Sequence, residues 1–204
     1  MATVVFRNLE PRDLDFIHQC KTDSQLNEMV VTSWKPFTKE QSKAWLDGWI
    51  KADNDPNTTY KAWAIATADK EERMVGWICL SEINNENKSA CFHGIVIGDK
   101  KYNDGITWIE AYLFLMNYVF EELNFNRLYG TYLMDHKISS KVGEVFLWTK
   151  EGVLRQASCK LGMFHDVGIN SILRDEYMQH KAAGKYDLKA ILKRITTMKK
   201  NKTL

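Results

Sequence analysis

Three closely spaced runs of β-forming residues, a long amphipathic helix and a further strand constrain the fold most strongly. The runs cover residues 60–68, 74–83 and 90–97, and short segments of Asn, Asp, Glu and Lys separate them. Such spacing predicts an antiparallel meander. After the loop 99–108, apolar residues recur at helical spacing over about four turns, which predicts an amphipathic helix. The next strand is predicted at residues 127–133.

The chain before this region is predicted to begin with a strand and two helical segments. Residues 3–9 form the expected strand, and residues 11–20 and 24–31 the expected helices. The sequence from Thr38 to Gln41 has the form of a capping box, in which each side chain pairs with a backbone N–H of the other residue. A third helix is therefore expected to begin there.

The chain after the central strands is predicted to add a helix at 136–148 and a β-hairpin from residues 152–159 and 163–173. This order of elements predicts an α/β (α+β) fold with one central, mixed and mostly antiparallel sheet flanked by helices. We expect a single domain at residues 1–180 and a basic C-terminal tail at residues 181–204.

The tail concentrates positive charge, because Asp187 is its single acidic residue among many Lys and Arg residues. The whole chain has a net charge of +2, so the rest of it is acidic, which argues against a nucleic-acid-binding core. Apolar residues of the tail recur at helical spacing and predict an amphipathic helix that packs on the domain, or binds a partner or a second subunit. A homodimer is left open.

The composition predicts a soluble, cytoplasmic protein. No run of about 18 apolar residues occurs, and the N-terminus has no secretory pattern, so no membrane association is expected. The cysteines are far apart and lack metal-binding spacing, so we expect small core residues and no metal site. They are Cys20, Cys79, Cys91 and Cys159.

Several segments, in the same order and spacing, resemble the ribosomal-protein-N-acetyltransferase-like branch of the GNAT superfamily over most of residues 3–177. The resemblance implies the GNAT fold, with a sheet splayed between its fourth and fifth strands. It also implies direct transfer of an acetyl group from acetyl-CoA to a primary amine. The segments that carry it are Gly94–Gly98, Glu110–Ala111, Leu123–Arg127, Glu151–Arg155, Lys160–Val167 and Ile172–Glu176.

The family binds the CoA pyrophosphate with a loop of the form R/Q-x-x-G-x-G/A at a helix N-terminus, where backbone N–H groups meet the phosphates. Here the loop is degenerate: Ile106 and Trp108 replace glycines, and Asp104 adds a repulsive charge. CoA binding is expected to be weakened but retained, because the helix N-terminus remains. The resemblance assigns donor contacts to Ile95, Val96, Ile97, Gly105, Ile106, Thr107, Trp108, His136 and Ser140.

The catalytic residues also depart from the family pattern. The acidic residue that many members carry on the fourth strand is absent, and His93 is the candidate base or water-positioning residue there. The alternative is a partly buried strand residue with a structural role. In the helix 136–148, His136 replaces the usual Asn and Gly143 the usual Tyr, so Ser139 is the candidate proton donor to the leaving thiolate.

The candidate acceptor contacts are mostly aromatic. The region of Trp34 and Phe37 lies near the acceptor entrance in this fold, and Tyr132 is a further candidate. His165 and Asp166 are neighbours on a strand and should point to opposite faces, so His165 is predicted to be structural or substrate-lining. The tryptophans at positions 45, 49, 63 and 77 are expected in the core or at a dimer surface.

The leading interpretation is therefore an N-acyltransferase for a small amine, such as an amino sugar or a polyamine-like metabolite. A GNAT-fold pseudoenzyme is the alternative, a binding or assembly module whose cleft is closed by Trp108. A third hypothesis keeps the transferase reaction but takes the acyl group from a donor other than CoA, such as an acyl carrier protein.

Overall fold

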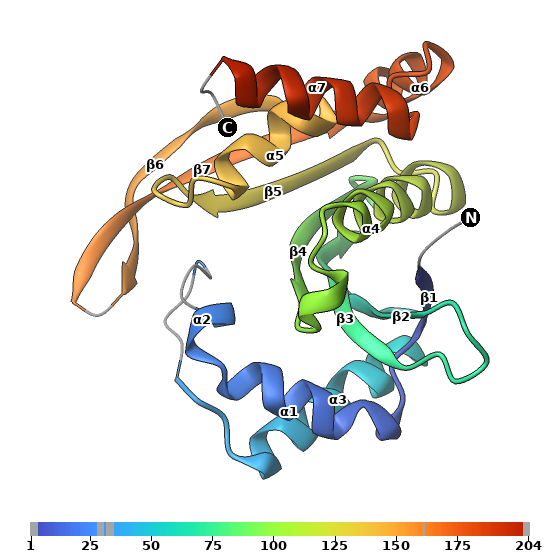
Figure 1. The fold of residues 1–204 in the computed structure, drawn as a ribbon, viewed down its shortest axis with the longest axis vertical. Coiled ribbons are helices and arrows are strands. Elements are labelled where there is room, and N and C mark those ends of the chain that lie inside the picture. Colours follow the sequence, from blue (N-terminus) through green and yellow to red (C-terminus); the bar gives the residue numbers. More distant parts are fainter. Residues whose placement is uncertain (1–3, 28–30, 32–34, 161, 202–204) are drawn as a thin grey trace. The chain divides into compact units, whose positions relative to one another are not determined.

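The computed structural model describes residues 4–27, 31, 35–160 and 162–201, and Figure 1 shows their fold. The chain divides into two compact units, which we describe separately. The first consists of the segments Met1–Glu28, Trp34–Asn84 and Cys91–Asn117. The second consists of Met29–Ser33, Asn85–Ala90 and Tyr118–Leu204.

The first unit contains four strands in the order β1-β2-β3-β4, with the first three pairing antiparallel. Two residues at the start of β4 belong to the second unit. The elements are β1 (Val4–Asn8), η1 (Pro11–Asp13), α1 (Leu14–Thr22), α2 (Ser24–Asn27), α3 (Lys39–Asp53), β2 (Lys61–Thr67), β3 (Met74–Asn84), β4 (Ser89–Ile97), η2 (Lys100–Tyr102) and α4 (Ile106–Asn117).

Helices cover both faces of these strands, with α1 and α3 on one face and α4 on the other (Figure 1). Strand β2 shows why, since its side chains alternate between the faces and nearly all are buried. Ala62 and Ala64 belong to the core cluster built with Trp77 and the α1 and α3 side chains. Trp63 points the opposite way and meets Phe114 of α4, with ring centroids 5.3 Å apart.

The predicted capping box begins α3. The Thr38 hydroxyl accepts from the Gln41 N–H at 3.2 Å, and the Gln41 side chain accepts from the Thr38 N–H at 2.9 Å. Within the helix predicted at residues 24–31, the described part is α2, Ser24–Asn27, and the Asn27 amide donates to the carbonyl groups of Cys20 and Asp23. Most of the remaining predicted residues lie outside those described.

The second unit contains three strands in the order β5-β7-β6, all antiparallel. Two of them, at residues 127–133 and 163–173, have the predicted bounds. The turn before β4 also belongs here, since the Lys88 carbonyl accepts from the N–H groups of Asn126 and Arg127. The elements are η3 (a π-helix, Tyr118–Glu122), β5 (Arg127–Leu133), α5 (Ser139–Phe146), β6 (Thr149–Lys160), β7 (Met163–Leu173), α6 (Arg174–Ala182) and α7 (Leu188–Lys200).

Two helices of this unit differ from the sequence prediction, and β6 is longer than residues 152–159. Helix α5 is shorter than residues 136–148: it ends at Phe146, and Leu147 after it takes a left-handed conformation with φ of 61°. Glycine favours that conformation, and the family usually has Gly-Phe here. Helix α6 was not predicted at all, and it spans the expected boundary at residue 180.

The basic tail forms helix α7, which packs against α5. Packing on the rest of the chain was one of the alternatives that the sequence left open. Ile191 is completely buried, and the Arg194 guanidinium donates to the Val145 carbonyl oxygen of α5. The Tyr186 hydroxyl, just before α7, donates to the Phe146 carbonyl oxygen at 3.1 Å. Part of the hydrophobic stripe, Ile191 and Met198, is therefore buried within the unit, whereas Leu188 and Leu192 are exposed.

The α/β fold class, with a mostly antiparallel sheet flanked by helices, is confirmed. The splay between strands four and five stays a prediction.

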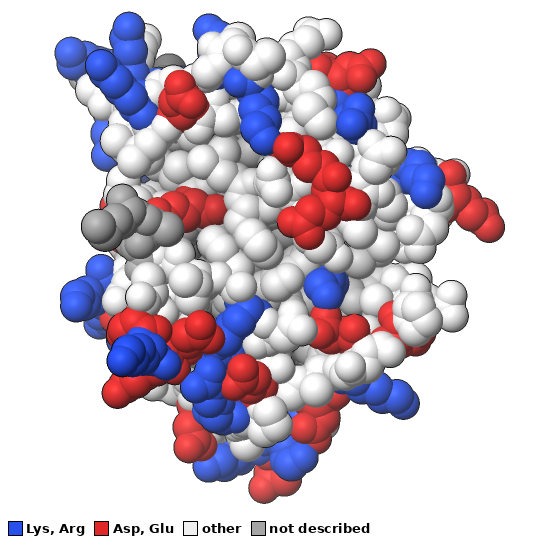
Figure 2. All heavy atoms as spheres, turned by 90° about the vertical axis from the view of Figure 1, so that its right-hand side faces the viewer, with Lys and Arg blue, Asp and Glu red and all other residues white. Residues whose placement is uncertain are grey.

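Acidic and basic side chains are intermingled over most of the face in Figure 2. None of the described helices has the length and apolarity needed to cross a bilayer. The described His, Cys, Asp and Glu residues also form no group suited to a metal ion.

Candidate active site

Asp104 binds the first N–H groups of α4 from the loop before the helix. Its Oδ1 atom accepts from the N–H groups of Ile106 and Thr107, both at 3.0 Å, and so caps the helix. Gly105 has a φ of +83°, and a Cβ atom there would meet nothing within 4 Å. The N–H groups expected to bind pyrophosphate are thus paired with a carboxylate of the chain, which bound phosphate must displace.

Trp108 is half-buried, and its indole N–H donates to the Asn103 side-chain oxygen at 2.9 Å, which ties the ring to the loop. The neighbouring Thr107 hydroxyl is buried and has no hydrogen-bond partner among the described residues. The loop therefore keeps the open space at Gly105, but Trp108 places an indole where the resemblance implies a glycine, and Asp104 adds an acidic side chain.

The predicted pantetheine contacts lie at the end of β4. Ile97 is buried, while Ile95 and Val96 are half-buried. Gly76 of β3 lets the strands approach closely, because a Cβ atom there would lie 2.3 Å from the Val96 carbonyl oxygen. This close packing holds the β4 backbone in place beside β3.

His93 lies at the rim of an open hollow of about 390 Å³ in the first unit. Burial on one side lowers the pKa of His93, the Lys21 ammonium lowers it further, and the Glu82 carboxylate opposes both. The imidazole is therefore neutral near pH 7 and able to accept a proton. The lining residues are Ala44, Trp45, Gly48, Trp49, Tyr60, Ser81 and His93.

Lys21 holds its ammonium among aromatic rings. The Nζ atom lies 4.5 Å from the centroid of the Trp45 ring, 5.3 Å from Phe37 and 5.5 Å from Trp77. Burial lowers the pKa of Lys21. Sequence reasoning missed this residue because a lysine in the last turn of a helix is ordinarily solvated.

In the second unit, His136 caps α5. Its Nδ1 atom accepts from the Ser139 N–H at 3.1 Å, and its carbonyl oxygen accepts from the Ser140 N–H at 3.0 Å. Burial lowers the pKa of His136, in keeping with a neutral ring that accepts at Nδ1. The Ser140 hydroxyl donates to the Lys137 carbonyl oxygen at 2.9 Å. His136 thus supplies the capping acceptor that an Asn side chain can also supply.

Gly143 stands where the family often has a catalytic Tyr, and local packing excludes a side chain there. A Cβ atom on Gly143 would lie 2.4 Å from the Nδ2 atom of Asn170, which is itself buried on β7. A larger residue would have to push Asn170 out of the space between α5 and β7.

Tyr132 is only 8% exposed, so little of its ring is available to a substrate. The ring covers Gly168, its partner across β5 and β7, where a Cβ atom would approach within 2.4 Å of the ring. Tyr132 therefore has a clear packing role in this unit.

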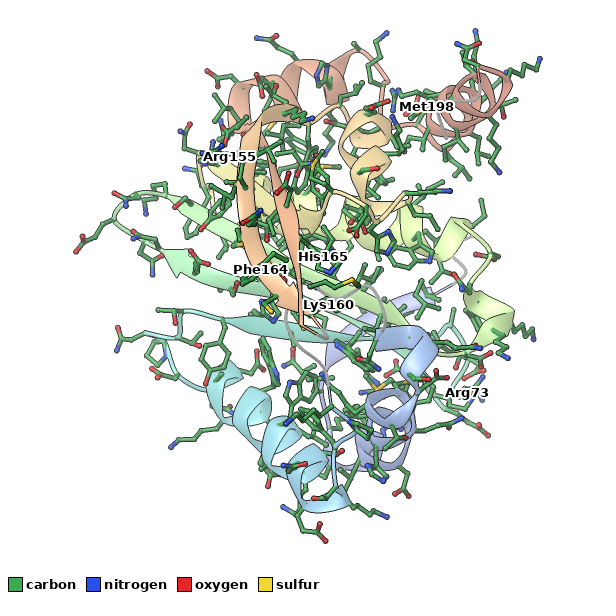
Figure 3. The ribbon with its side chains drawn as sticks, turned by 90° about the vertical axis from the view of Figure 1, so that its left-hand side faces the viewer. Arg73, Arg155, Lys160, Phe164, His165 and Met198 are labelled. Carbon is green, nitrogen blue, oxygen red and sulfur yellow. The ribbon has the colours of Figure 1, made fainter. Side chains whose placement is uncertain are left out.

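His165 pairs with Asp135, and not with its neighbour Asp166. The His165 Nδ1 and Asp135 Oδ2 atoms are 2.8 Å apart, while Asp166 accepts from the Gln156 N–H at 2.7 Å. Figure 3 shows His165 and Phe164 on opposite sides of the β6–β7 hairpin, as alternation along a strand requires. Sequence reasoning missed Asp135, which lies 30 residues before His165.

The structure brings the predicted site residues into two groups. The first unit holds His93, the β4 and loop residues, and Phe37, which lies against Lys21. Trp34 is outside the described residues. Trp63 and Trp77 are buried as predicted, whereas Trp45 and Trp49 line the hollow. The second unit holds Tyr132, His136, Ser139, Ser140 and His165.

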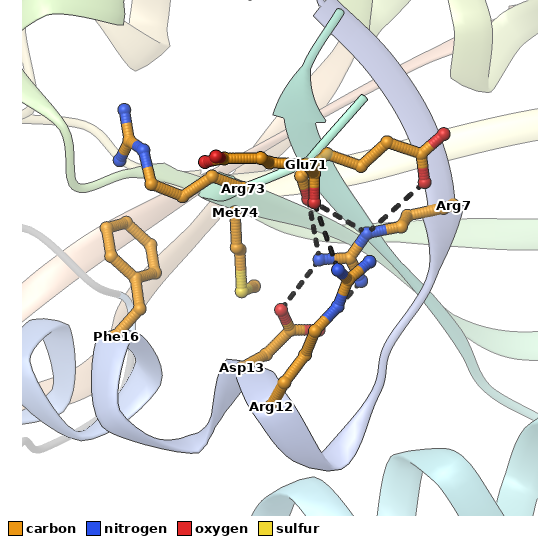
Figure 4. Close-up of a pocket in the computed structure, with 8 residues that line it drawn as sticks. Arg7, Arg12, Asp13, Phe16, Glu71, Arg73 and Met74 are labelled. Carbon is orange, nitrogen blue, oxygen red and sulfur yellow. Dashed lines mark hydrogen bonds and ion pairs between the residues drawn. The ribbon is translucent and has the colours of Figure 1, made fainter. Parts of the chain in front are cut away.

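A second hollow, of about 310 Å³, is lined by arginines but is a poor anion site (Figure 4). Arg7 makes two hydrogen bonds to the Asp13 carboxylate, at 2.7 and 2.9 Å. Arg73 pairs with Asp99 at 3.0 Å. Both guanidinium groups thus have carboxylate partners: Arg7 ties β1 to the start of α1, and Arg73 ties the start of β3 to the segment after β4.

Comparison with known proteins agrees with this architecture. The sequence profile of the acetyltransferase (GNAT) domain matches residues 3–145. Spermidine N-acetyltransferase from Vibrio cholerae, solved with CoA and spermine, is 21% identical with a TM-score of 0.74, covering 87% of this chain and 99% of that one. A point mutant of spermidine N-acetyltransferase from Vibrio cholerae is 22% identical with a TM-score of 0.71, covering 89% and 99%.

A search of curated proteins by sequence gave no match. The solved structures are only 21% and 22% identical to this chain, so the similarity to them shows the fold alone. The family profile covers well over half of the sequence. The chain therefore belongs to the GNAT acetyltransferase family.

Proposed function

We propose that this acetyltransferase acetylates the primary amine of a small molecule, with His93 as the base. The observation that carries the proposal is the position of His93, whose neutral ring borders a hollow large enough for a small ligand. An ammonium must lose a proton before it can attack a thioester, and a neutral imidazole accepts that proton near neutral pH. The spermidine N-acetyltransferase from Vibrio cholerae, solved with spermine, supports a small amine as acceptor.

Acetyl-CoA is the acetyl donor of the family. We assign the pantetheine contacts to the backbone of Ile95–Ile97, and the pyrophosphate contacts to the N–H groups that follow Gly105 once Asp104 is displaced. His136 and Ser140 complete the donor contacts. The amine nitrogen attacks the thioester carbonyl carbon, the C–S bond breaks, and Ser139 donates a proton to the thiolate while the proton that the nitrogen loses returns to the Ser139 oxygen.

The acceptor contacts that we propose are Trp34, Phe37 and His165, because Tyr132, the fourth candidate from the sequence, has little of its ring available to a substrate. His165 is also the second candidate for the base, because the Asp135 carboxylate orients its ring as in other acid–base pairs. The resemblance to the ribosomal-protein-N-acetyltransferase-like branch supports an acceptor amine but does not identify it.

The base is tested by the pH dependence of kcat/KM for His93→Gln and His165→Gln. If His93 is the base, His93→Gln should lose roughly 100-fold in kcat/KM near neutral pH, and kcat/KM should no longer fall at acidic pH. His165→Gln should keep that fall at acidic pH, the acidic limb of the profile. If the limb disappears in His165→Gln instead, the base is His165.

The pseudoenzyme hypothesis has its own supporting observation, the closed loop formed by Asp104 and Trp108. Calorimetric titration with acetyl-CoA and CoA separates the two hypotheses. Micromolar binding by the unmodified protein supports the transferase. Binding that appears only in Trp108→Gly supports a plugged cleft, and turnover with an acyl carrier protein alone would identify a donor other than CoA.

A further inference from the structure

The hollow beside His93, here called the aromatic hollow, has three aromatic rings in its lining. The Trp49 ring stands edge-on to Tyr60, with centroids 5.0 Å apart and an interplanar angle of 86°. Trp45 lies 5.6 Å from Trp49 at 56°. His93 adds a fourth ring, 6.4 Å from Trp49. Such edge-to-face arrangements present ring edges and faces on which a further aromatic group can stack.

Helix α3 leaves room for a ligand between these rings. Its residues at the hollow include Ala44 and Gly48, and a Cβ atom on Gly48 would meet nothing within 4 Å. Trp45 and Trp49 are half-buried and Tyr60 is 40% exposed, so their rings are accessible from solvent. The space of about 390 Å³ suits one aromatic ring with a short side arm.

The charges around the aromatic hollow disfavour a polycation. None of the described lining residues is acidic. The Lys21 ammonium lies 4.5 Å from the centroid of the Trp45 ring, and its charge already lowers the pKa of His93. Glu82, which acts on His93 in the opposite sense, is not among the lining residues. A polyamine would bring further ammonium groups next to Lys21, and the described lining residues offer no carboxylate to balance them.

We infer that the aromatic hollow binds the ring of an arylalkyl monoamine, the acceptor, with its amine directed toward His93. This inference rests on the proposed acetyl transfer and specifies its substrate class. The acceptor ammonium gives its proton to the imidazole, and the free amine forms a bond to the acetyl carbon. The C–S bond of acetyl-CoA then breaks, the sulfur leaves with the electron pair, and the thiolate gains a proton in place of the one that the nitrogen loses as the amide forms. Stacking on Trp49 and Tyr60 positions the ring, and the single positive charge is lost before the attack.

The test uses the full chain with 2-phenylethylamine, propylamine and spermidine, measuring CoA release. We expect kcat/KM for 2-phenylethylamine to exceed the other two by roughly tenfold or more. Trp49→Ala should raise KM for 2-phenylethylamine roughly tenfold and leave KM for propylamine unchanged, and Trp49→Phe should restore most of the difference. Phe164→Ala is the matched control, since Phe164 is 67% exposed on the β6–β7 hairpin.

Calorimetric titration of 2-phenylethylamine, with and without acetyl-CoA, separates this inference from the proposed function. Binding that Trp49→Ala weakens, without turnover of any amine, supports the aromatic hollow and overturns the proposed acetylation. Preference for spermidine, or equal affinities in the unmodified protein and Trp49→Ala, overturns the inference while acetylation stands. Failure of both the binding and every turnover assay overturns both.

Discussion

At the scale of single residues, Asp104 has two opposing effects. Its carboxylate satisfies two N–H groups at the start of α4, which stabilises the helix. The same contacts compete with any phosphate that approaches those N–H groups, and the negative charge repels it. The Asp104 side chain therefore raises the stability of the fold and lowers the affinity for a phosphate-bearing donor.

Asp104→Ala should bind CoA more tightly, since it frees the two N–H groups and removes the charge. It should also lower the free energy of unfolding by about 1 kcal/mol through loss of the cap. Asp104→Asn keeps a capping oxygen without the charge, so its affinity should lie between the two at nearly unchanged stability. Calorimetric titration and urea unfolding measure both quantities, and weaker CoA binding by Asp104→Ala would contradict this account.

Lys21 sets the protonation of His93 together with burial. Because the nearby ammonium disfavours the imidazolium, Lys21→Met should raise the pKa of His93 toward the ordinary histidine value of about 6.5. NMR titration of the His93 Hε1 resonance measures the shift, and the acidic limb of kcat/KM should move to higher pH with it. Lys39→Met, which removes an exposed ammonium paired with Asp15, is the control and should leave the His93 titration unchanged.

At the scale of elements, one carboxylate joins the three strands of the second unit. Glu151 of β6 accepts from Arg127 of β5 at 2.5 Å and from the Ser171 hydroxyl of β7 at 2.7 Å. These bonds, chiefly the one from Arg127, lower the pKa of Glu151 to about 2. The network ties the strand order β5-β7-β6 together near one end of the sheet.

The depressed pKa of Glu151 makes its contribution to stability depend on pH. The contribution is present above the unfolded pKa of about 4.5 and is lost as the pH falls toward 2. Because the side chain is 36% exposed, we expect only about 1 kcal/mol from it. Urea unfolding of Glu151→Gln at pH 7 should show that loss, and the difference from the unmodified protein should vanish near pH 2. A difference that persists at pH 2 would assign the loss to packing.

At the scale of the whole molecule, the sequence predicted elements with strong local signals. Strands at 127–133 and 163–173 were predicted at their observed bounds because they are rich in β-forming residues with clear turns around them. Helix α6 gave no such signal, since Tyr177 is its one buried residue and most of the others are polar or charged. Two contacts depend on tertiary packing, so no sequence spacing could predict them. They are the contact of His165 with Asp135 and that of Lys21 with its aromatic rings.

Helix α7 is expected to contribute to the stability of the second unit. Ile191→Ala should lower the free energy of unfolding by about 3 kcal/mol, because the side chain is completely buried against the rest of the unit. Leu192→Ala, on the same helix but 39% exposed, should cost less than 1 kcal/mol and serves as the control. Equal losses in urea unfolding would show that the helix does not pack as described.

Each compact unit is assembled from three separate stretches of chain. The backbone therefore passes back and forth between the units before β5 begins, and no single cut yields two self-contained pieces. During synthesis, the first unit has all its segments once Asn117 has been added, while the second still lacks its longest segment, which begins at Tyr118. Fragment expression and circular permutation must respect this interleaving, because a fragment that ends at Asn117 holds every segment of the first unit but also carries two segments of the second.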